Sequence, residues 1–198
     1  MNSDSNYFIF HPRLCHGFCL WLVALGLTIA SPWAQSQQSD IVQEYRLKAA
    51  FLYNFSQFIE WPESAFATPE TPFTICVVGD DPFGDTLLAL QKRKYQARAI
   101  EIIHPQSIAE ARNCRILYVD DPRKSALWRD IVKNLGDTPV LTVTSSDDAM
   151  TSGVCIGFVP RDGKVRWTMN LNAARKAQLK ISAKLIEIAV AIVGEAPR

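Results

Sequence analysis

The stretch that decides the fold is FTICVVG, residues 73–79, a short and mostly apolar run that is rich in valine and isoleucine. A run of this length and composition is typical of a strand buried on both faces of a sheet. Further strands are predicted downstream, at residues 95–103, 114–119 and 140–144. Helices are predicted between these strands, at residues 83–91, 107–112 and 123–135. Strands that alternate with helices predict a mostly parallel sheet with helices on both faces.

An opening helix is predicted over residues 41–59. Its apolar side chains recur at steps of three and four along the chain, as Ile41, Tyr45, Ala49, Leu52, Phe55 and Ile59. Ser39 or Asp40 can cap its start. Trp61-Pro62 should end it, because a proline disfavours helical geometry at the residue before it.

The end of the chain is predicted to add a hairpin and a helix. Residues 154–159 and 164–170 should form an antiparallel hairpin at the sheet edge, because Asp162-Gly163 between them is typical of a tight turn. Residues 171–193 are predicted to form one long closing helix. The predicted fold class is therefore α/β, a three-layer sandwich with a mostly parallel central sheet, an antiparallel terminal hairpin and a long C-terminal helix.

The first 36 residues have the pattern of a cleaved secretory signal peptide. Arg13 precedes an apolar run over residues 14–30, which is near the lower length limit of a membrane span. Ala34-Gln35-Ser36 places small residues where a signal peptidase reads them, so cleavage is predicted after Ser36, with Ala30 and Ala34 as alternatives. Cleavage after Ser36 would leave residues 37–198 as a single exported domain. The other interpretation of the apolar run is an uncleaved membrane anchor.

Few residues of the exported chain could support catalysis or bind nucleic acid. The formal net charge of +1 lacks the basic excess that phosphate binding requires. His104 is the one histidine after residue 36, and it precedes Pro105 at a predicted strand end, where a surface histidine is ordinary. The loop GDDPFG at residues 79–84 carries two carboxylates that would repel a phosphate. We therefore predict no catalytic residue, no cofactor and no enzyme activity; the alternative is a thiol-dependent enzyme built on Cys155.

Three aspartate doublets follow predicted strands, at residues 80–81, 120–121 and 147–148. Carboxylates at the carboxyl ends of parallel strands can hold Mg²⁺ or Ca²⁺. However, Asp81-Pro82 and Asp121-Pro122 place an aspartate before a proline, a pattern that starts a helix without any ligand. Capping is the favoured interpretation, and no metal site is predicted.

Three cysteines remain after residue 36: Cys76, Cys114 and Cys155. Their odd number allows at most one internal disulfide. Cys76 and Cys114 lie in predicted strands that can be neighbours in a parallel sheet, and export favours a disulfide between them. The alternative is two buried free thiols.

The predicted closing helix supplies the candidates for a partner-binding surface. Lysines recur along it at four-residue steps and branched apolar residues lie on its other side, so the candidates are Lys176, Lys180, Lys184, Ile188 and Ile192. A solvated face over a core face would explain this pattern. The functional interpretation is a patch for an acidic partner or for lipid head groups. Towards its end the helix would be apolar on most sides, which indicates a subunit interface.

Four stretches together resemble the YfiR-like family of periplasmic proteins: KAAFLYNFSQFIEWP (48–62), VVGDDPFG (77–84), CRILYV (114–119) and VRWTMNLNAARKAQLKISAKLIEIA (165–189). They span nearly the whole exported domain in the family's order. The resemblance implies a three-layer α/β domain that is often dimeric. It also implies a regulator that binds and represses an inner-membrane diguanylate cyclase of the YfiN type. An outer-membrane-associated partner of such proteins can sequester the repressor and release the cyclase.

The resemblance also bears on the cysteines. Cys76 and Cys114 match a disulfide pair of the family, whereas the family's second pair has only Cys155 here. We therefore expect a periplasmic homodimer that represses cyclic-di-GMP synthesis, and with it regulates biofilm formation, by protein contact. The alternative is a periplasmic small-molecule sensor that acts on another membrane signalling protein.

Overall fold

The computed structural model describes residues 33–119, 130, 133–146, 151 and 153–194. Its internal contacts divide the chain into two units, residues 1–39 and residues 40–198, and the fold described here is that of the second unit. The predicted signal peptide lies almost wholly outside the described residues and stays a prediction.

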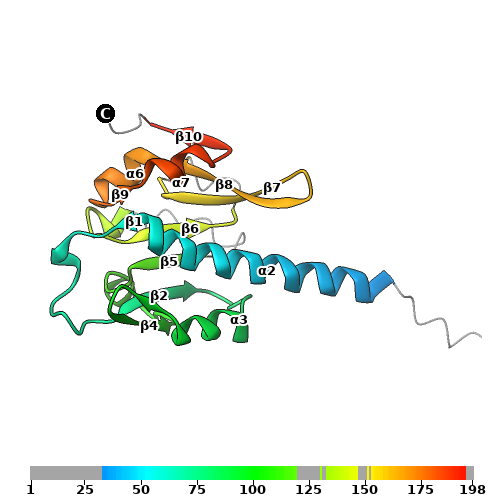
Figure 1. The fold of residues 1–198 in the computed structure, drawn as a ribbon, viewed down its shortest axis with the longest axis horizontal. Helices are drawn as coiled ribbons and strands as arrows, with labels where there is room; N and C mark the ends of the chain where they lie inside the picture. Colours follow the sequence, from blue (N-terminus) through cyan, green and yellow to red (C-terminus); the bar gives the residue numbers. More distant parts are fainter. Residues whose placement is uncertain (1–32, 120–129, 131–132, 147–150, 152, 195–198) are drawn as a thin grey trace, which may run out of the picture. The chain divides into compact units, whose positions relative to one another are not determined.

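An eight-stranded sheet forms the centre of this unit, in the order β10-β8-β7-β6-β5-β2-β4-β3 (Figure 1). Its strands are β2 (Phe73–Val78), β3 (Lys94–Tyr95), β4 (Arg98–Ile103), β5 (Ile116–Val119), β6 (Leu141–Thr144), β7 (Ile156–Arg161), β8 (Lys164–Asn170) and β10 (Ala191–Val193). Neighbouring strands are parallel except in the pairs β7–β8 and β3–β4. The predicted α/β class with a mostly parallel sheet is confirmed.

Two apolar clusters, one on each face of the sheet, give the three predicted layers. Successive residues of a strand point to opposite faces, so Ile75 of β2 belongs to the larger cluster and Cys76 to the smaller one. The larger cluster includes side chains from α2 (Trp33–Phe58), α3 (Asp85–Leu88), α6 (Leu171–Lys176) and α7 (Ala183–Glu187). The smaller cluster includes Ala111 of α4 (Ile108–Ala111) and Leu135.

The opening helix is longer at its start than the sequence predicted. α2 begins at Trp33, so Ser39 and Asp40 lie inside the helix and neither of them caps it. The helix ends at Phe58, one residue before the predicted end, because Ile59 already belongs to the short strand β1 (Ile59–Glu60). The 3-10 turn η1 (Glu63–Ala65) follows after Pro62.

The long closing helix was predicted wrongly. Residues 171–193 instead form α6, the short strand β9 (Lys180–Ile181), α7 and β10. α6 ends because Gln178 adopts a left-handed backbone with φ of 57°. α7 starts separately, with the Ser182 hydroxyl accepting a hydrogen bond from the Leu185 amide. The β-branched residues that follow favour extended structure, and β10 joins the sheet beside β8.

The hairpin forms as predicted, but it is not the edge of the sheet. Asp162 and Gly163 have φ values of 52° and 68°, as a two-residue turn between β7 and β8 requires. β10 pairs with the outer side of β8 and becomes the edge itself. The predicted strand 95–103 is a β3–β4 hairpin, and the predicted helix 83–91 is α3 followed by the 3-10 helix η2 (Ala89–Lys92). Most of the predicted helix 123–135 lies outside the described residues.

Candidate functional site

The five residues predicted to bind a partner do not form one stripe. Lys176 ends α6, Lys180 lies in β9 and Lys184 lies in α7, while Ile188 follows α7 and Ile192 lies in β10. All five side chains are exposed. Because the chain breaks between these elements, their four-residue spacing no longer places them on one face. The predicted stripe is therefore corrected to two separate surfaces.

The first surface is basic and lies beside the end of α2. Lys180 pairs in register with Glu60 across the β1–β9 sheet. The Lys184 ammonium is 5.6 Å from the centre of the Phe58 ring, within reach of a cation–π contact. Lys176 does not belong here, because it lines a cavity together with Cys155 and Asn170. Two exposed ammonium groups, that of Lys184 beside an aromatic ring and that of Lys180 in β9, are suited to an acidic partner surface.

The second surface is apolar and lies at the edge of the sheet. Ile188 and Ile192 share it with Val190 and Val193, and 36–56 % of each of these side chains is exposed. Figure 1 shows β10 beyond β8, next to α6 and α7. The sequence indicated an apolar interface in this region, but it implied the face of a helix rather than a strand edge.

A groove between α2 and the β7–β8 hairpin was missed in the sequence. It has a volume of about 620 Å³, and Leu47, Phe158 and Val165 are among its lining residues. Lys48 also lines it, although its side chain is only 5 % exposed. A signal was present, because Lys48 falls three residues after Tyr45 and four before Leu52, on the inward face of the predicted helix.

The Lys48 ammonium has three close neighbours in this groove, two from its own helix and one from β7. The ammonium lies 2.6 Å from a carboxylate oxygen of Glu44 and 4.5 Å from the centre of the Tyr45 ring. A second ring, that of Phe158, is 5.9 Å away. A buried ammonium requires such partners, because leaving one unpaired costs several kcal/mol.

We expect Glu44→Ala to lower the free energy of unfolding by about 1–2 kcal/mol, measured by urea denaturation. The variant leaves the Lys48 ammonium buried without its carboxylate. The expected loss of stability is modest, because Glu44 itself is half exposed and solvent screens the ion pair. Lys48→Met should change stability by less than about 1 kcal/mol, because it removes the buried charge and keeps the volume. Gln43→Ala, an exposed residue of the same turn with no described contact to Lys48, is the matched control. Equal stability of Glu44→Ala and Gln43→Ala would contradict the prediction.

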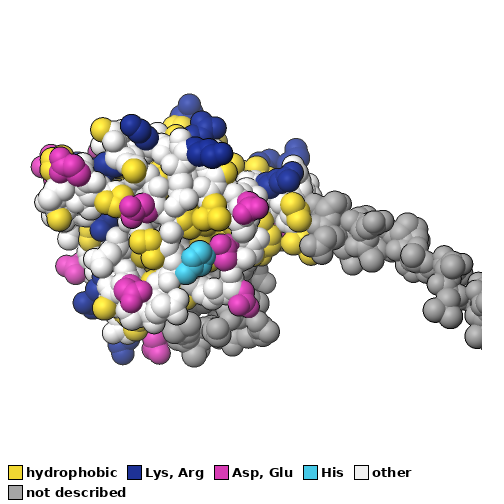
Figure 2. Space-filling view, turned by 90° about the horizontal axis from the view of Figure 1, so that it is seen from below, with side chains coloured by type: hydrophobic (Ala, Val, Ile, Leu, Met, Phe, Trp, Pro, Cys, Tyr) yellow, Lys and Arg dark blue, Asp and Glu magenta, His cyan; other side chains and the backbone are white. Residues whose placement is uncertain are grey.

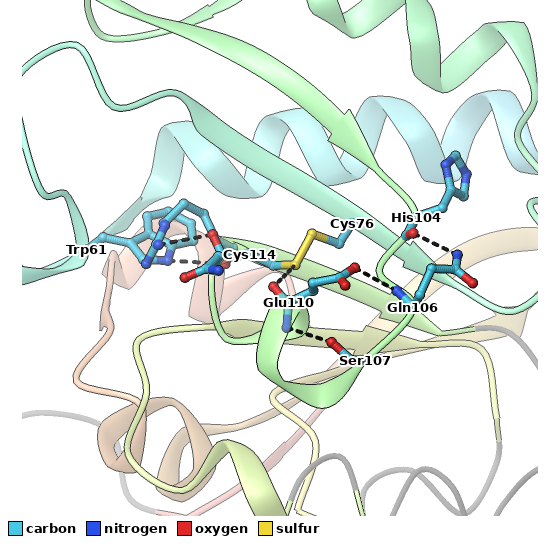
Figure 3. The surroundings of a disulfide bond; sticks show 9 residues. Trp61, Cys76, His104, Gln106, Ser107, Glu110 and Cys114 are labelled. Atoms are coloured by element: carbon cyan, nitrogen blue, oxygen red, sulfur yellow. Dashed lines mark hydrogen bonds between the residues drawn. A yellow bond between two sulfur atoms is a disulfide. The ribbon is translucent and has the colours of Figure 1, made fainter.

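The structure contains the Cys76–Cys114 disulfide, with the two Cα atoms 5.9 Å apart (Figure 3). Both cysteines are 1 % exposed, so the bond is buried in the smaller apolar cluster. α4 packs beside it as a capped turn, in which Ser107 accepts a hydrogen bond from the Glu110 amide and Glu110 accepts one from the Gln106 amide. The disulfide thus ties β2 to the segment between α4 and β5.

His104 and Asp81 meet where β4 and β2 end. The histidine Nε2 lies 3.1 Å from one oxygen of Asp81, and Figure 2 shows the one described histidine among carboxylates and apolar side chains. The other Asp81 oxygen accepts hydrogen bonds from the amides of Phe83 and Gly84. Asp81 therefore stabilises the turn at Phe83 and Gly84, but it does not start a helix as predicted, because α3 begins only at Asp85, with Gly84 at its N-cap position. The doublets at residues 120–121 and 147–148 lie outside the described residues.

Cys155 is a free and buried thiol. Burial raises its pKa, and this outweighs the opposite effect of hydrogen bonds from Thr142, so the thiol stays protonated and is a poor nucleophile. A cavity of about 410 Å³ lies beside it, with Asn170 and Lys176 among its lining residues. This environment gives the alternative of a thiol-dependent enzyme no support.

Among the residues that the structure describes, no helix has both the length and the apolar character needed to cross a membrane. Within the same residues, no group of three or more His, Cys, Asp and Glu side chains is placed to hold a metal ion.

Comparison with known families gives one match. Residues 45–190, well over half of the chain, match the profile of a family described as YfiR/HmsC-like. The matched stretch runs from α2, beside the groove, through the disulfide and seven of the eight strands of the sheet to the residue before β10. No curated protein matches the chain significantly.

Proposed function

The chain belongs to the YfiR/HmsC-like family, and on that premise we propose that it is a periplasmic regulator which represses an inner-membrane diguanylate cyclase by protein contact. The observation that carries the proposal is the match over residues 45–190. Proteins of this family are periplasmic and regulatory rather than catalytic, and they act on cyclic-di-GMP signalling. The buried disulfide supports an oxidising compartment.

The proposed partner is the periplasmic domain of the cyclase. The basic surface formed by Lys180 and Lys184 supplies exposed charge, which steers association and sets its salt dependence. Apolar contacts at the centre of an interface supply most of its affinity. An outer-membrane-associated protein would relieve repression by binding the regulator in place of the cyclase.

We expect deletion of the gene to raise cyclic-di-GMP and surface attachment, because the cyclase would lose its repressor. Cyclic-di-GMP is measured by mass spectrometry in the deletion strain and in the strain complemented with the wild-type gene. Complementation should restore the low level. An unchanged cyclic-di-GMP level in the deletion strain would overturn the proposal.

The double variant Lys180→Glu and Lys184→Glu should restore repression only in part, and pull-down of the cyclase should weaken most at low salt. The matched control reverses Lys92 and Lys94, which are exposed at the β3 edge on the opposite side of the sheet. Immunoblots of the periplasmic fraction verify equal amounts of each variant. Equal repression by both double variants would show that Lys180 and Lys184 do not contact the partner.

The groove beside Lys48 favours a second candidate, a periplasmic small-molecule sensor that acts on a different membrane protein. A concave, partly apolar site with a buried charged group is typical of ligand pockets. Thermal-shift measurements against a panel of carboxylates, amino acids and sugars test this candidate. A shift that is present in the wild type and lost in Lys48→Met, together with unchanged cyclic-di-GMP in the deletion strain, would favour the sensor.

A further inference from the structure

The cavity beside Cys155 has a polar wall that the proposed function does not use. It lies where β6 and β7 begin and where β8 ends, and its volume of about 410 Å³ is within the range of sites for small molecules. Two hydrogen bonds fix this corner of the sheet. The Cys155 backbone amide donates one of 3.0 Å to the Thr142 hydroxyl, and the Asn170 backbone amide donates one of 2.8 Å to the Cys155 carbonyl. One side of the cavity is therefore built on paired strands.

Asn170 brings an unpaired donor to this cavity. The residue is only 7 % exposed, and its side-chain Oδ1 accepts a hydrogen bond of 3.0 Å from the Ala173 amide. This bond fixes the orientation of the side-chain amide, so the Nδ2 is left with its two N–H donors. Among the described residues, none accepts a hydrogen bond from that Nδ2. Capping of α6 thus accounts for the oxygen, whereas a buried donor also requires an acceptor, which the cavity can admit.

The charge around the cavity has one sign. Lys133 and Lys176 line it, and among the described residues no aspartate or glutamate does so. Asp137 lies between two lining residues in the sequence but does not itself line the cavity. Asn172, an exposed lining residue, accepts a hydrogen bond from the Arg175 guanidinium, which brings a further positive charge near the opening. Positive charge combined with neutral N–H donors favours an anion.

We propose that this cavity binds a small organic acid, whose anionic group is held by the Asn170 Nδ2 and by the Lys176 ammonium. Asn170 supplies a neutral donor at the buried end, and Lys176, which is exposed, supplies the charge at the open end. Val140 and Ala177 line the same cavity and offer apolar contact to the carbon chain of the ligand. Carboxylate and phosphoryl groups share this chemistry, because both accept charge-assisted hydrogen bonds. Lys176 would thus serve a ligand rather than a protein partner.

Four probes that share one carbon chain test the charge of the ligand: butyrate, butyl phosphate, butanol and butylammonium. The protein is purified from the periplasm after expression of the full chain, and binding is followed by NMR titration at low salt. We expect the two anions to bind and the neutral and cationic probes not to bind. Anion binding should weaken as the ionic strength rises, because salt screens the lysine charge. The ratio of the two anion affinities shows whether the cavity prefers a carboxylate or a phosphoryl group.

Substitutions test the two residues that hold the anion. Lys176→Gln should weaken binding of the preferred anion by about tenfold, because one charge-assisted hydrogen bond is lost. Lys94→Gln, which is exposed at the β3 edge, is the matched control and should bind as the wild type does. Asn170→Asp keeps an oxygen to cap α6 but replaces the donor with negative charge, so it should abolish binding. If Asn170→Asp fails to fold, Asn170→Ser keeps a capping oxygen, removes the Nδ2 and should weaken binding by about tenfold.

Saturable binding of an anion that moves the Asn170 side-chain resonance, and that the Lys176 and Asn170 variants weaken, supports the proposal. Equal binding of butanol, no saturation by either anion below about 10 mM, or equal affinity of Lys176→Gln and Lys94→Gln overturns it. A response that Lys48→Met removes and Lys176→Gln retains would place the anion in the other groove and overturn it as well.

The inference does not rest on repression of a cyclase. An unchanged cyclic-di-GMP level in the deletion strain would defeat the proposed function alone. Failure of the anions to bind would defeat the inference alone, because the proposed contact with the cyclase uses the separate basic surface of Lys180 and Lys184.

Discussion

Replacing both Cys76 and Cys114 with alanine is expected to lower the free energy of unfolding by about 4 kcal/mol. The two cysteines are 38 residues apart, and cross-linking a loop of that length removes about this much entropy from the unfolded chain at 25 °C. A loss of this size is a large part of the 5–15 kcal/mol that stabilises a typical domain. The midpoint of urea denaturation should fall accordingly.

The control for this prediction is Cys155→Ala. Cys155 is as deeply buried as the bonded cysteines but closes no loop, so its replacement should cost only the small loss of packing. A reducing agent should act on the wild type slowly under native conditions, since both sulfur atoms lie in the core, and readily in urea. If the double variant and Cys155→Ala were equally stable, the disulfide would have no more than a packing role.

Strands buried on both faces could be predicted from the sequence because burial dictates their composition. Residues 73–79 and 114–119 are mostly apolar, and their strands lie in the middle of the sheet. The turn at Asp162-Gly163 could also be predicted, because few dipeptides adopt left-handed backbone at two successive positions. Both signals are local, and tertiary contacts did not override them.

The closing segment could not be predicted in the same way, because its spacing fits a helix while its structure depends on distant partners. β9 pairs with Ile59 and Glu60, and β10 pairs with β8. Neither contact is visible in residues 171–193 alone. The apolar character on most sides of the predicted helix was the sign that this segment is not a surface helix.

Among the candidate sites, too, features with a local sequence signal could be predicted, and features built from distant segments could not. The Cys76–Cys114 bond could be anticipated, because Cys76 lies in β2 and Cys114 lies two residues before β5, the strand that pairs with β2. The groove beside Lys48 and the free edge at β10 required the structure, since each brings together segments that lie far apart in sequence. Ile188 and Ile192 are exposed, outside the long helix that was predicted to carry them, and their contact with a partner stays a prediction.

Phe55→Ala is expected to lower the free energy of unfolding by about 3–5 kcal/mol, because it empties the contact that holds α2 on the sheet. Phe55 is fully buried. Its ring centre lies 5.4 Å from that of Trp167 in β8 and 5.9 Å from that of Phe158 in β7. Alanine would leave a cavity between the helix and two strands, and a sheet that is already paired cannot move in to fill it.

The size of the loss should follow the volume removed. Phe55→Leu should cost less than half as much as Phe55→Ala, because leucine keeps most of the apolar contact. Asn54→Ala, one residue earlier on the exposed side of α2, should be nearly neutral. Urea denaturation of the three variants should give equal slopes and different midpoints. If Phe55→Ala were as stable as Asn54→Ala, α2 would be held by its other contacts, and the aromatic cluster would not be what fixes the helix above the sheet.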